Sequence, residues 1–103
     1  MKFAEVKGSA SGMIGFKNWQ LEAYCNGRRV HSYGQRHPEN ATKLATFIVG
    51  LIKKGYAATP KSLIKLMKAM KITTVAKLIL KMVPGGQGPA LAIKMMELST
   101  KIP

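Results

Sequence analysis

The stretch that decides the fold runs from Trp19 to Tyr33 and reads WQLEAYCNGRRVHSY. Apolar and polar residues alternate on both sides of a central Asn26-Gly27 pair, which is typical of two strands joined by a tight turn. Asn-Gly accepts positive φ at both turn positions, as a two-residue type I′ turn requires. The sequence therefore predicts an antiparallel β-hairpin with its turn at Asn26-Gly27.

A two-residue turn also predicts the register of the hairpin, because residues that lie opposite each other share a face of the sheet. The expected opposite pairs are Cys25 with Arg28, Ala23 with Val30, and Glu22 with His31. The core face is then formed by Trp19, Leu21, Ala23, Cys25 and Val30. The outer face is expected to be polar, aromatic and net basic, and to carry Gln20, Glu22, Tyr24, Arg29, His31 and Tyr33.

Two further segments next to the hairpin have the composition of strands. Met13 to Lys17 is expected to supply a third antiparallel strand, and Lys2 to Lys7 a fourth. The apolar period changes near Gly34, so we expect the antiparallel sheet to be confined to residues 1–34 and helices to fill residues 38–103. A chain of 103 residues fits one domain with one core. The predicted fold class is α+β, with a small N-terminal antiparallel sheet followed by about four helices in a single domain, 1–103.

The first two helices have clear ends. Residues 38–40 offer start signals for the first helix, and Gly55 offers its stop. The second helix opens with Thr59 as N-cap and Pro60 at the first helical position. Their expected buried residues are Leu44, Phe47, Ile48, Leu51 and Ile52 in the first helix, and Leu63, Leu66, Met67 and Met70 in the second.

The last two helices are separated by a short segment rich in Pro and Gly. The third helix is expected to begin near Thr73 or Thr74 and to end before Pro84, and the fourth opens at Pro89. Their expected buried residues are Val75, Leu78, Ile79 and Met82, then Leu91, Ala92, Met95 and Leu98. The core predicted for the whole chain consists of Trp19, Leu21, Val30, Phe47, Ile48, Leu51, Leu63, Met67, Leu78 and Ile79.

The charge of the chain is strongly one-sided, with 17 Lys and Arg against four acids and a formal net charge of +13. Such an imbalance repels itself in the folded state, so it favours a function that involves an anionic partner. The four glutamates are scattered, and Cys25, His31 and His37 lack metal-ligand spacing or a third ligand. These features predict a binding protein without catalytic residues, metal or cofactor.

Lysines provide the most informative pattern in the second half of the chain. Four of them recur at intervals of four, three and three, which would place them on one face of the second helix, opposite its apolar stripe. These four are Lys61, Lys65, Lys68 and Lys71. Lys77 and Lys81 extend the same bias on the third helix, and no acidic residue lies between Glu39 and Glu97. We interpret this cationic ridge as a nucleic-acid contact.

Residues 12–50 resemble the DNA-binding domains of plant ethylene-response factors and the arm-site-binding domains of phage and transposon integrases. The resemblance rests on Trp19 at the opening of a strand, the turn at 26–29, Gly34 after the next strand, and a helix soon afterwards. Such domains place the exposed face of a three-stranded sheet in the major groove of DNA. The resemblance implies that the DNA contacts would be made by Tyr24, Arg29, His31, Arg28 and Lys17.

These observations lead to three alternative functions. The first is a nucleic-acid-binding protein that acts by occupancy, with lysines on phosphate and the sheet face reading bases or shape, and with DNA favoured over RNA. The second is an accessory or inhibitor protein of the phage or mobile-element type, which docks on a larger host DNA-processing enzyme. The third is a cationic membrane-surface protein. The lone Cys25 and the absence of a long apolar segment favour a cytoplasmic protein without membrane insertion.

Overall fold

The hairpin predicted at Asn26-Gly27 is present in the computed structural model, which describes residues 2–11, 18–33, 37–38, 41–66 and 71–101. Strand β2 (Asn18–Cys25) pairs antiparallel with strand β3 (Arg28–Ser32). Asn26 and Gly27 have φ angles of 53° and 78°, the left-handed values that a type I′ turn needs. Local turn chemistry thus explains this part of the sheet.

The register of the hairpin differs from the prediction beyond the turn. Cys25 lies opposite Arg28 as expected, but His31 lies opposite Ala23, and Ser32 lies opposite Glu22. A β-bulge causes the shift, because Val30 is an extra residue on β3 that has no partner of its own on β2. One extra residue moves every later side chain of β3 to the other face of the sheet.

Strand β1 (Lys2–Ser11) lies between β2 and β5 (Tyr56–Ala58). It pairs antiparallel with β2 and parallel with β5. The predicted strand over Lys2 to Lys7 is therefore confirmed and extends further. The described strands run in the order β3-β2-β1-β5, and β4 (His37–Pro38) pairs with the start of β2.

The expectation of a purely antiparallel sheet confined to residues 1–34 is wrong. Strand β5 is only three residues long, yet it adds a parallel edge to β1 from a point beyond residue 40. Parallel pairing needs a long crossover connection, and helix α1 forms the last part of that connection. The strand predicted for Met13 to Lys17 lies outside the described residues.

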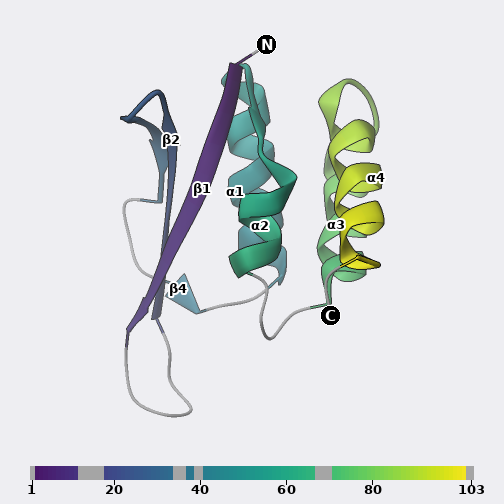
Figure 1. Cartoon of the computed structure of the whole chain (residues 1–103), viewed down its shortest axis with the longest axis horizontal. Coiled ribbons are helices and arrows are strands. Elements are labelled where there is room, and N and C mark those ends of the chain that lie inside the picture. The colour runs from purple at the N-terminus through teal and green to yellow at the C-terminus, as the bar shows by residue number, and fades with distance from the viewer. Residues whose placement is uncertain (1, 12–17, 34–36, 39–40, 67–70, 102–103) are drawn as a thin grey trace.

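Four helices are present in the described residues, and all of them lie on the same side of the sheet. They are α1 (Ala41–Lys53), α2 (Pro60–Leu66), α3 (Ile72–Met82) and α4 (Gln87–Ser99). Helices α1 and α2 lie next to the sheet, and α3 and α4 lie beyond them (Figure 1). The fold is α+β, as predicted. Helices α3 and α4 begin one or two residues earlier than the sequence signals suggested, which is the usual precision of helix ends.

The core is one apolar cluster that joins the sheet to the helices. Its largest fully buried side chains are Phe47, Leu21, Leu44, Ile48, Leu51, Leu63, Ile79, Met95 and Val75. Of the predicted core, Val30 and Leu78 are half-buried residues at the edge of this cluster, and Met67 and the side chain of Trp19 lie outside the described part of the chain. The predicted burial of Met82 is wrong, because this side chain at the end of α3 is 38% exposed.

Two hydroxyl side chains join α2 to β1. Thr59 immediately precedes α2, as predicted, but its Oγ1 donates to the carbonyl of Ala4 at 3.1 Å instead of accepting from a helix N–H. Ser62 is a buried polar residue, and its Oγ accepts the N–H of Val6 at 3.1 Å. Pairing with β5 stops at Ala4, so Ser62 supplies the bond that a longer β5 would have given to Val6.

Replacing Phe47 with Ala should lower the free energy of unfolding by about 3–5 kcal/mol, because the ring is fully buried and its removal leaves a cavity. Phe3→Ala is the matched control, since Phe3 is 65% exposed and its loss should change stability by less than about 0.5 kcal/mol. Urea denaturation of both variants measures the difference. Equal midpoints would show that α1 does not pack on the sheet as described.

Replacing Ser62 with Ala should destabilise the protein by about 1–3 kcal/mol, because the buried N–H of Val6 would lose its acceptor. Thr100→Ala is the control, because this exposed hydroxyl bonds only within its own helix end. Thermal and urea unfolding report the loss. Amide hydrogen exchange at Val6 should accelerate in Ser62→Ala alone, and an unchanged rate would contradict the assigned bond.

Candidate functional site

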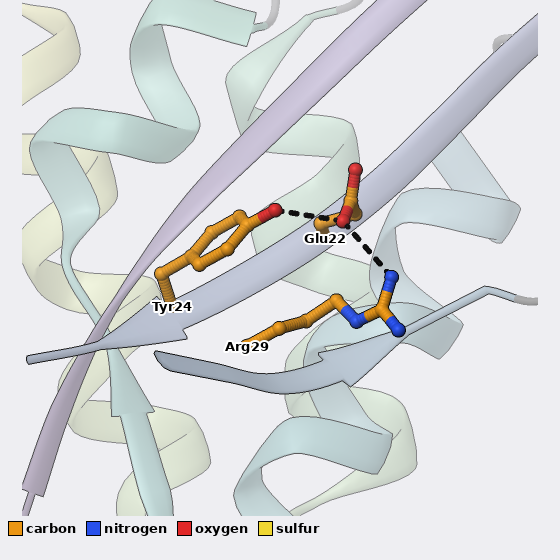
Figure 2. Close-up of polar contacts among 3 residues, drawn as sticks. All are labelled: Glu22, Tyr24 and Arg29. Carbon is orange, nitrogen blue, oxygen red and sulfur yellow. Dashed lines mark hydrogen bonds and ion pairs between the residues drawn. The ribbon is translucent and has the colours of Figure 1, made fainter. Parts of the chain in front are cut away.

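The outer face of the sheet carries a small polar cluster centred on Glu22. Tyr24 donates its hydroxyl to Glu22 Oε2 at 2.8 Å, and Arg29 Nη1 donates to the same oxygen at 3.4 Å. Figure 2 shows that the tyrosine, on the same strand as Glu22, and the guanidinium, on the neighbouring strand β3, both approach this carboxylate. The hydrogen bond to Glu22, followed by burial and the charge of Glu22, raises the pKa of Tyr24. Tyr24 and Arg29, two of the predicted nucleic-acid contacts, therefore both bind the carboxylate of Glu22.

The same face receives two charged side chains from β1, those of Lys7 and Glu5. Lys7 Nζ lies 5.2 Å from the centre of the Tyr24 ring, a cation–π contact. Glu5 lies opposite Tyr24 in the register. Among the described residues, Glu5 and Glu22 therefore balance Lys7 and Arg29 on this face. The prediction of a net basic sheet surface is wrong, because the sequence pattern of the hairpin does not include the residues contributed by β1.

His31, a predicted nucleic-acid contact, faces the helices and not solvent. Its ring lies 4.6 Å from that of Phe47 and packs against Gly50 of α1, where a Cβ atom would lie only 3.0 Å from His31 Nε2. Tyr33 also packs on Phe47, with ring centres 5.3 Å apart, and its hydroxyl donates to the carbonyl of Lys43. The bulge at Val30 explains the correction, since it turns both aromatic residues to the core side.

The environment of His31 disfavours its protonated form. Its Nδ1 is buried without a hydrogen-bond partner in the described residues. Burial, followed by the positive charge of Lys54, lowers the pKa of His31 and outweighs the opposite effect of the Phe47 backbone. A neutral ring that packs between β3 and α1 is a structural element of the fold.

The remaining predicted sheet contacts do not join Tyr24 and Arg29. Arg28 is exposed but lies opposite Cys25, whose strand position is on the helix side of the sheet. Lys17 lies outside the described residues. Of the four described sheet residues that the resemblance implied, the structure brings together Tyr24 and Arg29.

The predicted lysine ridge is divided between two helices. Lys61 and Lys65 are exposed on α2, but α2 ends at Leu66 and Lys71 immediately precedes α3. Lys68 lies outside the described residues. The second helix was expected to carry all four, but Lys71 has an extended backbone, with φ −74° and ψ 124°, and so does not lie on α2. The expectation that all four lysines share one helix face is therefore wrong.

Exposed lysines nonetheless dominate the helical part of the molecule. Lys77 and Lys81 are exposed on α3, which packs on α1 and α4, while α2 packs on α4 and β1. Among residues 41–66 and 71–101 there are ten exposed lysines against one acid, Glu97. These lysines are Lys43, Lys53, Lys54, Lys61, Lys65, Lys71, Lys77, Lys81, Lys94 and Lys101. The positive charge of the protein lies mainly around the helices.

Searches for other functional groups give two findings. Within the described ranges, no group of three or more His, Cys, Asp or Glu side chains could hold a metal ion. No helix in the part of the chain that the structure describes is long and apolar enough to cross a membrane.

Comparison of the chain with protein-family models, with curated proteins and with solved structures finds no match. The resemblance of residues 12–50 to sheet-plus-helix DNA-binding domains therefore stays a prediction.

Sequence reasoning missed an apolar hollow that is lined by residues of β1, β5 and α4. Phe3 contributes to it, and this side chain is 65% exposed although it lies on a central strand. A signal was present in the alternation of β1, where Ala4 and Val6 point inward and Phe3 must point outward.

The free energy of unfolding should fall as the pH drops below about 6.5, the ordinary pKa of histidine. Because the pKa of His31 is lowered in the folded state, the unfolded chain binds more protons in this range, so His31 contributes its full stability above that pH and loses it below. Urea denaturation between about pH 7.5 and 5 measures the slope, at pH values above the glutamate range.

The two histidines allow a matched comparison. His31→Gln should flatten the dependence on pH, whereas His37→Gln should leave it in place. A slope that disappears with His37 and survives the loss of His31 would contradict the assignment.

Proposed function

We propose that the protein binds nucleic acid through the lysines of its helices and acts by occupying it, without catalysis. The observation that carries the proposal is the excess of ten exposed lysines over one acid among the described helical residues. A surface of one sign costs stability through self-repulsion, and an anionic polymer relieves that cost. Ordinary solvation needs no such excess, because surfaces usually mix both signs.

The spread of the lysines favours contacts with phosphate over the reading of bases. Lys61 and Lys65 lie on α2, and Lys77 and Lys81 lie on α3, so the charges are distributed over separate helices. Contacts with the backbone fix position and supply affinity but carry no sequence information. DNA is favoured over RNA by the resemblance of residues 12–50. Cytoplasmic residence is proposed from the single free thiol of Cys25.

Exposed apolar side chains support a second candidate, an accessory protein that docks on a larger host enzyme. Phe3 is 65% exposed and Ile93 is 54% exposed. Pull-down from lysate with and without nuclease separates the two candidates. Partners that are lost with nuclease support nucleic-acid binding, and a defined protein partner that survives supports docking.

Affinity for a DNA duplex should fall steeply with salt, because each phosphate that a lysine neutralises releases counterions. Four lysine contacts imply a slope of roughly −3 to −4 in log affinity against log salt on B-DNA. Fluorescence anisotropy between about 50 and 200 mM salt gives the slope. Replacing Lys61, Lys65, Lys77 and Lys81 with Gln should remove most of it and weaken binding to all sequences alike.

Three variants that each remove two positive charges locate the interface. Lys61→Gln/Lys65→Gln and Lys77→Gln/Lys81→Gln should each flatten the slope by about two units, and Lys7→Gln/Arg29→Gln should change it little. Equal effects of all three would mean that only net charge matters. The absence of binding to duplex and single strand below about 0.1 mM near physiological salt would refute the proposal.

A further inference from the structure

A mainly apolar cavity lies between α4 and the short strand β5. Its volume is about 330 Å³, within the lower range of small-molecule sites. Its lining residues are Phe3, Ile52, Ala57, Ala58, Pro60, Gln87, Ala90, Leu91 and Lys94. They come from β1, α1, β5, α2 and α4, so the packing of five elements creates the space.

Small side chains explain why this space is not filled by the protein. Ala57 and Ala58 form the β5 side, and Ala90 lies on the exposed side of α4. These methyl groups are too small to cover the ring of Phe3, which stays 65% exposed. When an apolar ligand displaces water from an apolar hollow beside an exposed phenyl ring, the burial of apolar surface favours binding.

The polar groups of the cavity select the head group of such a ligand. Gln87 and Lys94 are its polar side chains, and no carboxylate is among the described lining residues. Lys94 Nζ lies 3.9 Å from Glu97 Oε2, and both side chains are more than half exposed, so this pair is weak and Lys94 is open to a stronger acceptor. The neighbouring chain positions add positive charge at Lys2, Lys53 and Lys61. A cationic ligand is disfavoured here, and an anionic one is favoured.

We propose that this cavity binds a small apolar carboxylic acid, with the chain or ring of the acid between Phe3, Ala57 and Leu91 and its carboxylate at Lys94. None of the lysines used to test the proposed nucleic-acid function, Lys61, Lys65, Lys77 and Lys81, lines this cavity. The site does not depend on that function. Burial of the apolar part supplies affinity, and the lysine supplies selectivity for the anion.

Octanoate, octanol and octylammonium test the proposal, because they share a chain and differ in the head group. NMR titration of the full chain should show saturable octanoate binding, with shifts concentrated at Ala57, Ala58 and Leu91. Octanol should bind about threefold to tenfold more weakly, and octylammonium more weakly still. Shifts spread evenly over the lysine-bearing helices would mean unspecific attraction to a basic surface and would overturn the proposal.

Variants separate the apolar and charged parts of the site. Ala90→Leu fills the cavity from an exposed helical position where Leu is well tolerated, so the fold should persist while octanoate affinity falls by about tenfold or more. Lys94→Gln should reduce octanoate affinity to that of octanol without changing octanol binding. Lys81→Gln removes the same charge elsewhere and should change neither. Unaltered octanoate binding in Ala90→Leu, with the fold intact, would overturn the proposal.

Discussion

The arrangement of the sheet depends on how the backbone of β1 is satisfied beyond the end of β5. Pairing with β5 stops at Ala4, and the next N–H of β1 on that edge, that of Val6, would be buried without an acceptor. Ser62 Oγ accepts this N–H, and Thr59 donates to Ala4, so two hydroxyls complete the edge. Because both residues belong to the start of α2, the same bonds fix the helix on the strand. The cavity beside β5 is bordered on the β5 side by the small side chains of Ala57 and Ala58.

A second constraint is the single extra residue in β3. Without the bulge at Val30, His31 and Tyr33 would join Tyr24 and Arg29 on the outer face. With it, both rings pack on Phe47, and α1 gains an aromatic contact with the edge of the sheet. The outer face loses two groups suited to nucleic acid, while the contact between β3 and α1 becomes sensitive to protonation. One backbone irregularity thus moves His31 from a binding surface to the core.

The parts of the fold that local chemistry determines were predictable from sequence. Asn26-Gly27 specifies the turn, Pro60 begins α2, and the spacing of Leu44, Phe47 and Leu51 defines the buried face of α1. The bulge and the parallel pairing of β5 depend on contacts between distant segments, which a periodic pattern does not encode. The candidate site was less predictable for the same reason, because the balance of charge on the sheet depends on β1 lying beside β2.

The distribution of acids is the feature that best separates the two surfaces of this protein. Glu5 and Glu22 lie on the sheet, where each has a described positive residue on the same face, and Glu22 also accepts from Tyr24. Exposed ion pairs of this kind contribute little stability. Their main effect is that the outer face of the sheet carries no net charge among the described residues. The helices keep almost all of the uncompensated charge. Because the sheet face is neutral and the helices are strongly basic, an anionic polymer is favoured to approach from the helical side. The sheet packs against α1 and α2, and its strands β1 and β5 border the apolar cavity.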